Sequence, residues 1–420
     1  MPDKKKKKYN ISALTWNVAN KNPPKETMEQ LANEFAKAKP DILLVSLQEA
    51  KTSWLENENI GQRIFKRLNF ITIYSDYFNV LTKPKKLTNW LHIAETNLVI
   101  GIKPKLFKNN EVSVEHYHSG KERPNRMNKG GLYTSIRVGN SRIGVISVHL
   151  ESYSEENRKR EIDALMNHFP SHQFDQVIFA GDLNERLESN IMSDNMRNSY
   201  DGLHASTANE ISEYLIEKYD PISNGNSHLT TEHKMNFERP REFTYQEVDD
   251  KGNIKNKEGR NNRPDCGAFD TIGYKDNNSQ LKVRKINNES ISVVTPTKNG
   301  QENGKAISDH NAVIVHFELQ DRKKLAPLEK LRRNLEDNIT NERFELFLGS
   351  SHKVIINNKE YQVPERIKLL YEVLMSNEAN QDKIEIIQAI QQSAKNYQSP
   401  KTIFGVTTTY KRLDKCYPVF

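Results

Sequence analysis

The segment VIFAGDLN, residues 177–184, joins a run of four apolar residues to a short polar tip. A second segment, SDHNAVIV at residues 308–315, has the reverse order, with polar residues before an apolar run. Short apolar runs of this kind are typical of strands buried on both faces. Both segments therefore place carboxylate, amide and imidazole groups at the end of a buried strand, where such groups can hold a divalent cation and activate a water.

Three further strand-like runs end in polar residues of chemical use, namely Asn17, Glu49 and His149. Carboxylate and amide oxygens suit Mg²⁺, and imidazole beside carboxylate suits proton handling and stabilisation of a phosphoryl oxygen. Each of these residues alone is more often a turn, cap or core residue. Their shared position at apolar runs predicts metal-assisted hydrolysis of a phosphoester.

The chain of 420 residues exceeds a typical single domain. We expect a basic tail at residues 1–8, a catalytic domain at 9–320 and a helical C-terminal region at 325–420. The division rests on the change near residue 321 from alternating strand-like and helix-like runs to helical spacing with little strand character.

Within the expected catalytic domain, apolar spacing predicts helices over residues 25–39 and 155–169, the second with Ser154 as N-cap. Residues 186–262 are polar and are expected to form loops and short helices above the strand ends. Strands are expected over residues 11–16, 41–47, 98–102, 133–138, 143–148 and 311–319.

The net charge of +7 is concentrated at the two ends of the chain. Residues 1–8 carry five Lys and one Asp, and residues 321–420 carry 17 basic and 13 acidic residues, which leaves residues 9–320 at −1. A protein that grips duplex DNA through its backbone usually has an excess of Lys and Arg on the binding domain. The charge distribution therefore disfavours a general nuclease.

Five motifs follow one another in residues 9–320: TWNV at 15–18, QE at 48–49, SVHL at 147–150, GDLN at 181–184 and SDH at 308–310. In identity and order they resemble the motifs of the endonuclease/exonuclease/phosphatase superfamily. The resemblance implies a four-layered α/β sandwich, two mixed β-sheets flanked by helices, here followed by the C-terminal helical region. It also implies Mg²⁺-dependent cleavage of a phosphoester.

Four features resemble the inositol polyphosphate 5-phosphatase branch more closely. They are NKGG at 128–131, Arg186 shortly after GDLN, FTY at 243–245, and PDCGAFDTI at 264–272, which is similar to the branch's Pro-x-Trp-x-Asp-Arg-Ile/Val signature. The resemblance implies that the substrate is an inositol phosphate or a phosphoinositide.

The chain also departs from that branch. Gln246 stands where the branch has Lys, Cys266, Gly267 and Ala268 interrupt the signature without a Trp, and Thr271 replaces its Arg. The missing residues include groups expected to contact substrate phosphates, so the reaction class is better supported than the substrate. A DNase-like endonuclease and a sphingomyelinase-like phosphodiesterase on the same fold stay open as alternatives, as does a binding module without activity.

The residue chemistry and the resemblance together suggest a metal site and a nucleophile. We expect Glu49 to bind Mg²⁺, helped by Asn17 and Asp309. Asp182 is expected to orient and deprotonate the attacking water, and Asn184 to help position it.

The same reasoning suggests how the substrate is held. We expect His310, held by Asp270, to donate a hydrogen bond to the phosphoryl oxygens, and His149 to contact the same phosphate from the other side. Contacts with the rest of the substrate are expected from Lys129, Arg186 and Tyr245, the two cations gripping additional phosphates.

The cysteine count and the N-terminal sequence indicate the compartment in which the protein is expected to act. Cys266 and Cys416 are the only cysteines, which argues against a disulfide framework and a zinc cluster and favours a reducing, cytoplasmic compartment. The sequence contains no apolar run of the ~18 residues that a membrane span needs, and no apolar segment follows the lysines at 4–8, so we expect no cleaved signal peptide.

The lysine run is expected to be a solvated tail, with peripheral contact to an anionic membrane as the second reading. Nucleic acid is a less favoured partner, and no motif in residues 325–420 indicates what that region binds. The Asn- and Lys-rich composition suggests the hypothesis of a bacterial effector that is exported into a host cell without a cleaved signal.

Overall fold

The computed structural model of the chain divides into two compact units, Met1–Arg322 and Lys323–Phe420. In the second unit the described residues form a hairpin of β16 (Lys353–Ile356) and β17 (Lys359–Gln362), and the helices expected there lie outside the described residues. The structure describes residues 7–51, 59–79, 94–109, 111–122, 129–152, 154–168, 174–187, 205–246, 266–300, 306–321, 353–356 and 359–362.

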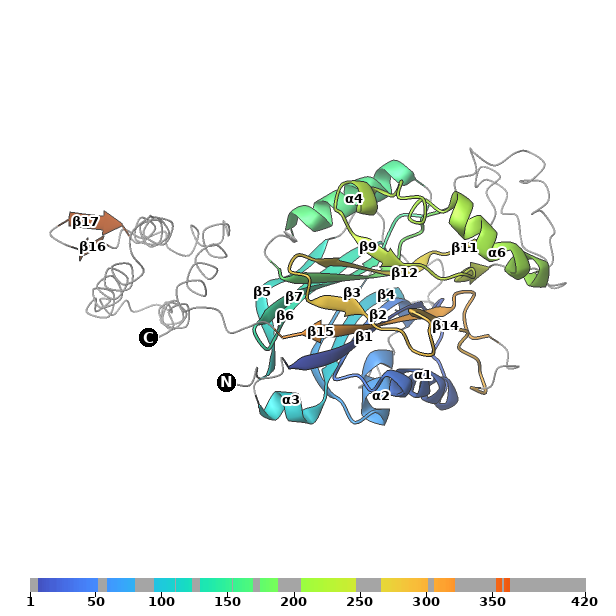
Figure 1. Cartoon of the computed structure of the whole chain (residues 1–420), viewed down its shortest axis with the longest axis horizontal. Helices are drawn as coiled ribbons and strands as arrows, with labels where there is room; N and C mark the ends of the chain where they lie inside the picture. Colours follow the sequence, from blue (N-terminus) through green and yellow to red (C-terminus); the bar gives the residue numbers. More distant parts are fainter. Residues whose placement is uncertain are drawn as a thin grey trace, which may run out of the picture. The chain divides into compact units, whose positions relative to one another are not determined.

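The first unit consists of two stacked β-sheets with helices on their outer faces (Figure 1). Among the described residues, sheet one has the strand order β13–β15–β1–β2–β4–β3, with β14 also paired to β15, and sheet two has the order β5–β6–β7–β8–β12–β9. The expected fold class, a four-layered α/β sandwich of two mixed sheets flanked by helices, is confirmed.

The strands of sheet one are β1 (Lys8–Asn17), β2 (Ile42–Lys51), β3 (Ile71–Asn79), β4 (Ala94–Ile102), β13 (Leu281–Val283), β14 (Ile291–Val294) and β15 (Ala312–Gln320). The strands of sheet two are β5 (Val112–Glu122), β6 (Gly130–Val138), β7 (Ser141–His149), β8 (Gln176–Asp182), β9 (Asn236–Glu238) and β12 (Asp270–Asp276). A separate pair is formed by β10 (Tyr245–Gln246) and β11 (Cys266–Gly267). The helices are α1 (Lys25–Ala38), α2 (Ile60–Arg67), α3 (Pro104–Lys108), α4 (Glu155–His168), α6 (Ala205–Tyr219) and α7 (His228–Thr231).

Each sheet contains a parallel strand pair joined through a helix. In sheet one β1 runs parallel to β2 and α1 connects them; in sheet two β7 runs parallel to β8 and α4 connects them. Parallel strands need such a crossover, and their carboxyl ends meet at one edge of the sheet. The Ser154 side chain accepts a hydrogen bond from Asn157 N at 3.2 Å, which confirms it as the cap of α4.

Three apolar clusters hold the layers together. Buried residues of the two sheets pack against each other, among them Ile11 and Leu44 from sheet one and Val145 and Ile178 from sheet two. A second cluster joins α1 and α2 to the outer face of sheet one, and a third joins α4 to the outer face of sheet two. Burial of these faces is what fixes the stacking of the two sheets.

One expectation for the chain was incomplete. Residues 186–262 were expected to form loops and short helices, yet the described part of this stretch contains the 15-residue helix α6 and strand β9, which extends sheet two. Packing against β12 outweighs the polar composition of β9 (Asn236–Glu238). None of the described helices is long and apolar enough to cross a membrane.

Candidate active site

Sheet two carries polar residues in register at one end of its strands. Gly130 pairs with His149, His149 with Asp182, and Asp182 with Asp270. Side chains of directly paired residues point to the same face of a sheet. His149, Asp182 and Asp270 therefore project together, and the contacts described below show that they face residues of sheet one.

The Asp182 carboxylate is buried and fully engaged. Its Oδ2 accepts a hydrogen bond from Asn17 Nδ2 at 3.1 Å, and its Oδ1 accepts from the backbone N of Asn184 at 3.0 Å. His149 Nε2 lies 3.5 Å from the Asp182 Oδ2. Burial alone would raise the pKa of Asp182, but the nearby His310, His149 and Lys129 outweigh burial and lower the pKa to about 2.

Asp182 is thus ionised at neutral pH. A fixed anion of this kind suits the expected orientation of an attacking water. A carboxylate with so low a pKa is a weak base, since an efficient general base titrates near the working pH. Its expected role as proton acceptor stays a prediction.

Asp270 and His310 form a buried ion pair. His310 Nδ1 lies 2.7 Å from Asp270 Oδ2. Burial raises the pKa of Asp270 to about 6 against the opposing effect of His310. Burial would lower the pKa of His310, but Asp270 outweighs it and raises the pKa to about 9. Both groups are therefore charged at pH 7, and His310 can act as a donor towards an anion.

Two hydrogen bonds fix this pair to the scaffold. Trp16 Nε1 donates to the carbonyl oxygen of His310 at 3.1 Å, and Asp270 N donates to Thr244 Oγ1 at 2.9 Å. The bond from Trp16 ties the end of β1 to the segment before β15. The ion pair consequently depends on both sheets being in place.

Glu49 lies at an irregular point of β2. The pairing of β2 with β4 shifts between Leu47 and Ala50, and Glu49 has a φ of +49°, in the left-handed region that L-residues seldom adopt. Its Oε2 accepts from Asn20 Nδ2 at 3.1 Å, and its Oε1 lies 3.9 Å from His149 Nε2. Burial raises the pKa of Glu49, while Lys129 and His310 act in the opposite direction. Backbone strain at a functional position is a known feature of binding sites.

Lys129 is a buried cation at the centre of the site. Its Nζ contacts His149 Nε2, and the protonation of the His149 ring decides which of the two groups donates. Burial lowers the pKa of Lys129, whereas Asp182 and Glu49 raise it. Lys129 is only 8% exposed. The structure therefore places it beside the residues expected to act on the reacting phosphate.

The remaining expected contacts lie around this centre. Asn184 has a φ of +50°, and its Nδ2 donates to the Leu150 carbonyl oxygen at 2.9 Å. Arg186 Nε donates to the Ser152 carbonyl oxygen at 3.3 Å, and its guanidinium lies 4.9 Å from the centre of the Phe269 ring. These contacts hold both side chains in place, and their roles towards a substrate stay predictions.

Tyr245 forms one aromatic wall of the site. Its ring stacks on Phe269 with 5.0 Å between ring centroids and lies 4.6 Å from the ring of His310. Tyr245 and His310 also form an isolated β-bridge. The geometry therefore places Tyr245 against the Asp270–His310 pair.

Three residues, Glu49, Asn17 and Asp309, are expected to bind the metal ion. The carboxylates of Glu49 and Asp182 approach the same His149 nitrogen, and Asp309 is exposed next to His310. Asn17 Oδ1 accepts from Ala19 N at 3.0 Å, and its Nδ2 donates to Asp182 Oδ2 at 3.1 Å. Carboxylate and amide oxygens are hard ligands that suit Mg²⁺, and the roles of Glu49, Asn17 and Asp309 as metal ligands stay predictions.

A polar contact joins the two sheets beneath these residues. Ser46 on β2 and Ser147 on β7 lie 2.7 Å apart through their hydroxyl oxygens, and Ser46 Oγ also donates to the Ala180 carbonyl oxygen at 3.0 Å. Gln48 Nε2 donates to Ser46 Oγ at 2.8 Å. A buried network of this kind specifies one relative position of the sheets.

A family model for "Endonuclease/Exonuclease/phosphatase family 2" matches residues 14–316. The chain belongs to the endonuclease/exonuclease/phosphatase family. This family consists of phosphoester hydrolases that generally use divalent metal ions. The matched residues include β2, β7, β8, the end of β1 and the whole polar cluster. The resemblance drawn from the motifs is confirmed.

The solved structures to which this chain is similar are distant in sequence. The inositol polyphosphate 5-phosphatase domain of SPsynaptojanin, in complex with inositol (1,4)-bisphosphate and calcium, is 15% identical, with a TM-score of 0.47 and coverage of 91% of this chain and 93% of that one. D. rerio TDP2 with a single-strand DNA product is 14% identical, with a TM-score of 0.39, covering 73% and 98%. Cimex nitrophorin, in a ferrous NO complex, is 14% identical, with a TM-score of 0.45, covering 74% and 99%. A search of curated proteins found no match.

Some residues that support the site of this phosphoesterase-family chain were not foreseen. Trp16 and Thr244 stand inside the TWNV and FTY motifs, so a search for groups that hold the ion pair would have found them. Ser308 stands inside the SDH motif, whereas Asn20 gave no signal in the sequence. Ser308 Oγ donates to the Asn17 carbonyl oxygen at 2.8 Å, which joins the last motif to the first.

Proposed function

We propose that the chain is a Mg²⁺-dependent phosphatase that removes a phosphate from an inositol phosphate or a phosphoinositide. The observation that carries this proposal is the meeting of Glu49, Asp182 and the Asp270–His310 pair around His149 and the buried Lys129. Anionic groups that suit a cation lie there beside cationic groups that suit a phosphate.

Each group at the candidate site has its own role in the proposed reaction. Bound Mg²⁺ at Glu49 supplies polarisation of a phosphate oxygen and neutralises developing charge. Asp182, held by Asn17 and the Asn184 backbone, orients the attacking water. Protonated His310 donates to a phosphoryl oxygen, and Asp270 keeps it charged and correctly turned.

Lys129 and Arg186 favour a substrate with more than one phosphate. Both are buried cations, 8% and 7% exposed, and Arg186 is held in place by Phe269 and Ser152. Lys and Arg donate charge-assisted hydrogen bonds to phosphate oxygens, and Arg can donate two of them to one phosphate. Inositol phosphates present several phosphates on one small ring, and phosphoinositides present the same group at a membrane surface.

The test is a phosphate-release panel with the full chain. Soluble inositol phosphates and short-chain phosphoinositides are incubated with Mg²⁺ or with a chelator, and released phosphate is measured. We expect release that requires Mg²⁺ and disappears in Asp182→Asn. Plasmid nicking and release of phosphocholine from sphingomyelin are measured in parallel, and activity in either of these with no phosphate release overturns the proposal.

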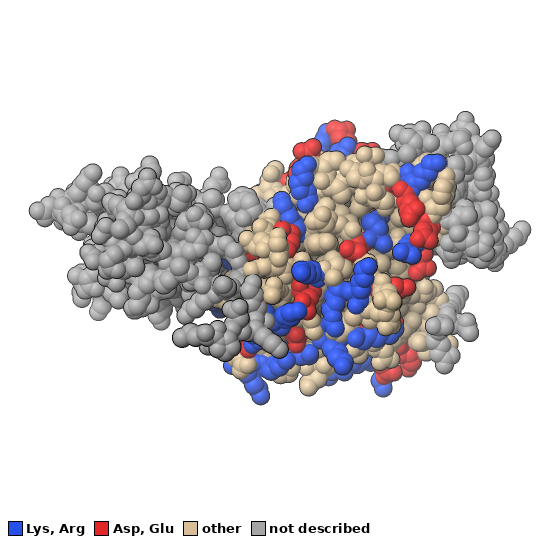
Figure 2. Space-filling model, viewed as in Figure 1, with Lys and Arg blue, Asp and Glu red and all other residues tan. Residues whose placement is uncertain are grey.

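The nuclease alternative is disfavoured by charge. Residues 9–320 have a net charge of −1, and on the face of the molecule in Figure 2 Lys and Arg lie interspersed with Asp and Glu. Several of these charges are paired, as in Lys103–Asp41 at 3.1 Å. A groove for duplex DNA needs unbalanced positive charge along the backbone path.

The proposal extends to the setting of the enzyme. A phosphoinositide substrate would bring the chain to an anionic membrane, where the lysines at 4–6 would add attraction of about 1 kcal/mol each near the surface. Lys7 and Lys8 form ion pairs with Glu111 and Glu318. Two cysteines in 420 residues suit a reducing cytoplasm, either of the producing cell or of a host cell that receives the protein. Cosedimentation of the chain with vesicles of anionic lipid, with and without these lysines, tests the membrane contact.

A further inference from the structure

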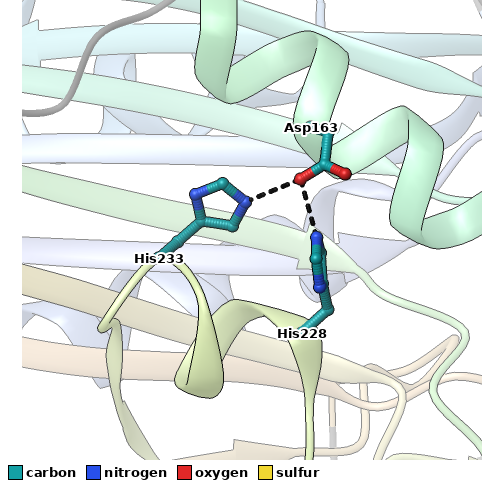
Figure 3. Close-up of side chains that lie close together, drawn as sticks. All are labelled: Asp163, His228 and His233. Carbon is teal, nitrogen blue, oxygen red and sulfur yellow. Dashed lines mark hydrogen bonds and ion pairs between the residues drawn. The ribbon is translucent and has the colours of Figure 1, made fainter.

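A second cluster of metal-ligating side chains lies on the outer side of sheet two. Asp163 projects from α4, while His228 opens α7 and His233 follows it (Figure 3). His228 Nε2 lies 2.6 Å and His233 Nε2 lies 3.1 Å from the same oxygen, Asp163 Oδ1. None of these residues takes part in the site described above.

The three ligand atoms converge as a metal site requires. They all lie within 4.8 Å of one another, and the two imidazole rings stand at 86° with centroids 5.3 Å apart. Around a tetrahedral Zn²⁺ with bonds of about 2.0–2.1 Å, ligand atoms are about 3.3 Å apart. The two separations from Asp163 Oδ1 differ from that value by well under ~1 Å, and the two histidine nitrogens lie within 4.8 Å of each other.

The backbone holds the two histidines at this position without any ion. Ser227 caps α7 by accepting from Leu229 N at 3.3 Å, and Glu232 N donates to the His228 carbonyl oxygen at 3.0 Å, so one helical turn lies between the two histidines. Leu229 and Met235 are buried in the apolar cluster that contains Ile162 and Leu165 of α4. The segment is therefore packed on α4, and the ligands are preorganised.

The surroundings leave room for an ion to enter. The side chain of Asp163 is 48% exposed, and those of His228 and His233 are 17% and 18% exposed. Three protein ligands at a partly open surface leave one position for water, as in three-ligand zinc sites. Imidazole ligands select transition ions such as Zn²⁺ and disfavour Mg²⁺.

From this geometry we propose that Asp163, His228 and His233 form a second metal site, for Zn²⁺ or a similar divalent transition ion, which clamps α4 to the segment around α7. The cysteine count, which argued against a zinc cluster, does not bear on a site made of histidine and carboxylate. A hydrogen bond links the proposed metal site to the candidate active site. Ser227, the residue before His228, donates through its Oγ to Glu185 Oε1 at 2.6 Å, and Glu185 directly follows Asn184.

The test is a zinc titration of the full chain in saturating Mg²⁺, followed by calorimetry and by thermal unfolding. We expect one strong zinc site per chain and a higher melting temperature with zinc. His228→Ala and His233→Ala should each weaken zinc binding at least ~100-fold, beyond the loss caused by changes in outer partners of a metal site. Either variant should also lose the zinc-dependent rise in melting temperature.

Three further variants make the result decisive. Asp163→Asn, a half-exposed change on α4, should weaken zinc binding without unfolding the chain, and Glu156→Gln on the exposed face of the same helix should leave it unchanged. Glu49→Gln at the proposed magnesium site should also leave zinc binding unchanged. Unchanged zinc affinity in all three triad variants, zinc binding lost only in Glu49→Gln, or no zinc binding by the wild-type chain overturns the proposal. These readouts do not depend on phosphatase activity.

Discussion

Asp182 shows how burial and charge act against each other on one side chain. Burial alone would favour its neutral form, yet His310, His149 and Lys129 keep it ionised with a pKa of about 2. The Asn17 side chain and the backbone N of Asn184 each donate a hydrogen bond to one of its two oxygens. The carboxylate is therefore fixed in charge and in direction before any substrate binds, which is the form of preorganisation that stabilises a transition state.

Replacement of this carboxylate by its amide tests that role. Asp182→Asn keeps the shape of the side chain and removes its charge, so we expect turnover to fall at least ~100-fold, on the scale of a lost group that acts in the transition state. Turnover is measured on whichever phosphoester the wild-type chain hydrolyses, and circular dichroism checks the fold. Glu29→Gln, an exposed change on α1, is the matched control. Near-normal turnover of a folded Asp182→Asn protein would remove Asp182 from the mechanism.

At the scale of elements, the pairing of β1 with β15 buries an ionisable ring. His316 on β15 is the register partner of Ser12 on β1, and its Nδ1 lies 2.7 Å from Ser12 Oγ. Burial, followed by the charge of Arg284, lowers the pKa of His316 to about 4. The folded chain therefore keeps this ring neutral down to a pH at which the unfolded chain has already protonated it.

Protonation of His316 in the unfolded chain makes the free energy of unfolding depend on pH. An unfolded histidine titrates near pH 6.5, so between pH 6.5 and about 4 the unfolded state binds more protons and the free energy of unfolding falls as the pH falls. Across this pH range His316 lowers the free energy of unfolding by about 3 kcal/mol. We expect His316→Asn to lose this part of the pH dependence, measured by urea unfolding at several pH values. Identical pH dependence in both proteins would show that His316 does not titrate in this way.

The close approach of β7 and β8 sets a second constraint. A Cβ at Gly181 would overlap the carbonyl oxygen and the side chain of Val148, which belong to the neighbouring strand. Gly181→Ala is therefore expected to lower the free energy of unfolding by about 1–3 kcal/mol, as overpacking does, and to reduce turnover because Asp182 is the next residue.

The matched control separates crowding from backbone strain. Gly225 has a φ of +72° with nothing within 4 Å of an added Cβ, so Gly225→Ala meets only the conformational cost of about 1 kcal/mol. We expect it to keep normal turnover. Urea unfolding and turnover are measured for both variants, and equal behaviour of the two would contradict the steric explanation.

The same elements show what the sequence could and could not predict. The strands that begin or end in the motifs were predictable, because their apolar runs are short, continuous and bounded by polar residues. The register of β12 was not, since the pairing of Asp270 with Asp182 depends on how β12 packs antiparallel on β8. The orientation of Asn17 was also out of reach, because it is set by Ala19 and by a residue far along the chain.

At the scale of the whole molecule, hydrogen bonds near Arg322 join the end of the first unit to earlier residues of the same unit. Asp321 N donates to the Lys7 carbonyl oxygen at 2.8 Å, and Asp321 Oδ1 accepts from Asn140 N at 3.0 Å, so the residue after the last strand is tied to both sheets. Every residue proposed for the phosphatase site precedes this point.

A chain that ends at Arg322 is therefore expected to fold and to retain its turnover on a soluble substrate within about threefold of the full chain. A chain that ends at Asn311 lacks β15, which pairs with β1, β13 and β14, and is expected not to fold, because central strands supply both ladder bonds and core packing. Thermal unfolding and phosphate release compare the two. Loss of folding in the longer fragment would show that residues 323–420 support the catalytic unit.

The residues of the candidate site come from both sheets and from widely separated parts of the chain. Trp16 and Glu49 come from one sheet, Asp182 and Asp270 from the other, and His310 arrives just before the last strand. During synthesis the nascent polypeptide holds Asn17 long before His310 leaves the ribosome, so a partly made enzyme is inert. Turnover is thus expected only after the segment that holds His310 has been made.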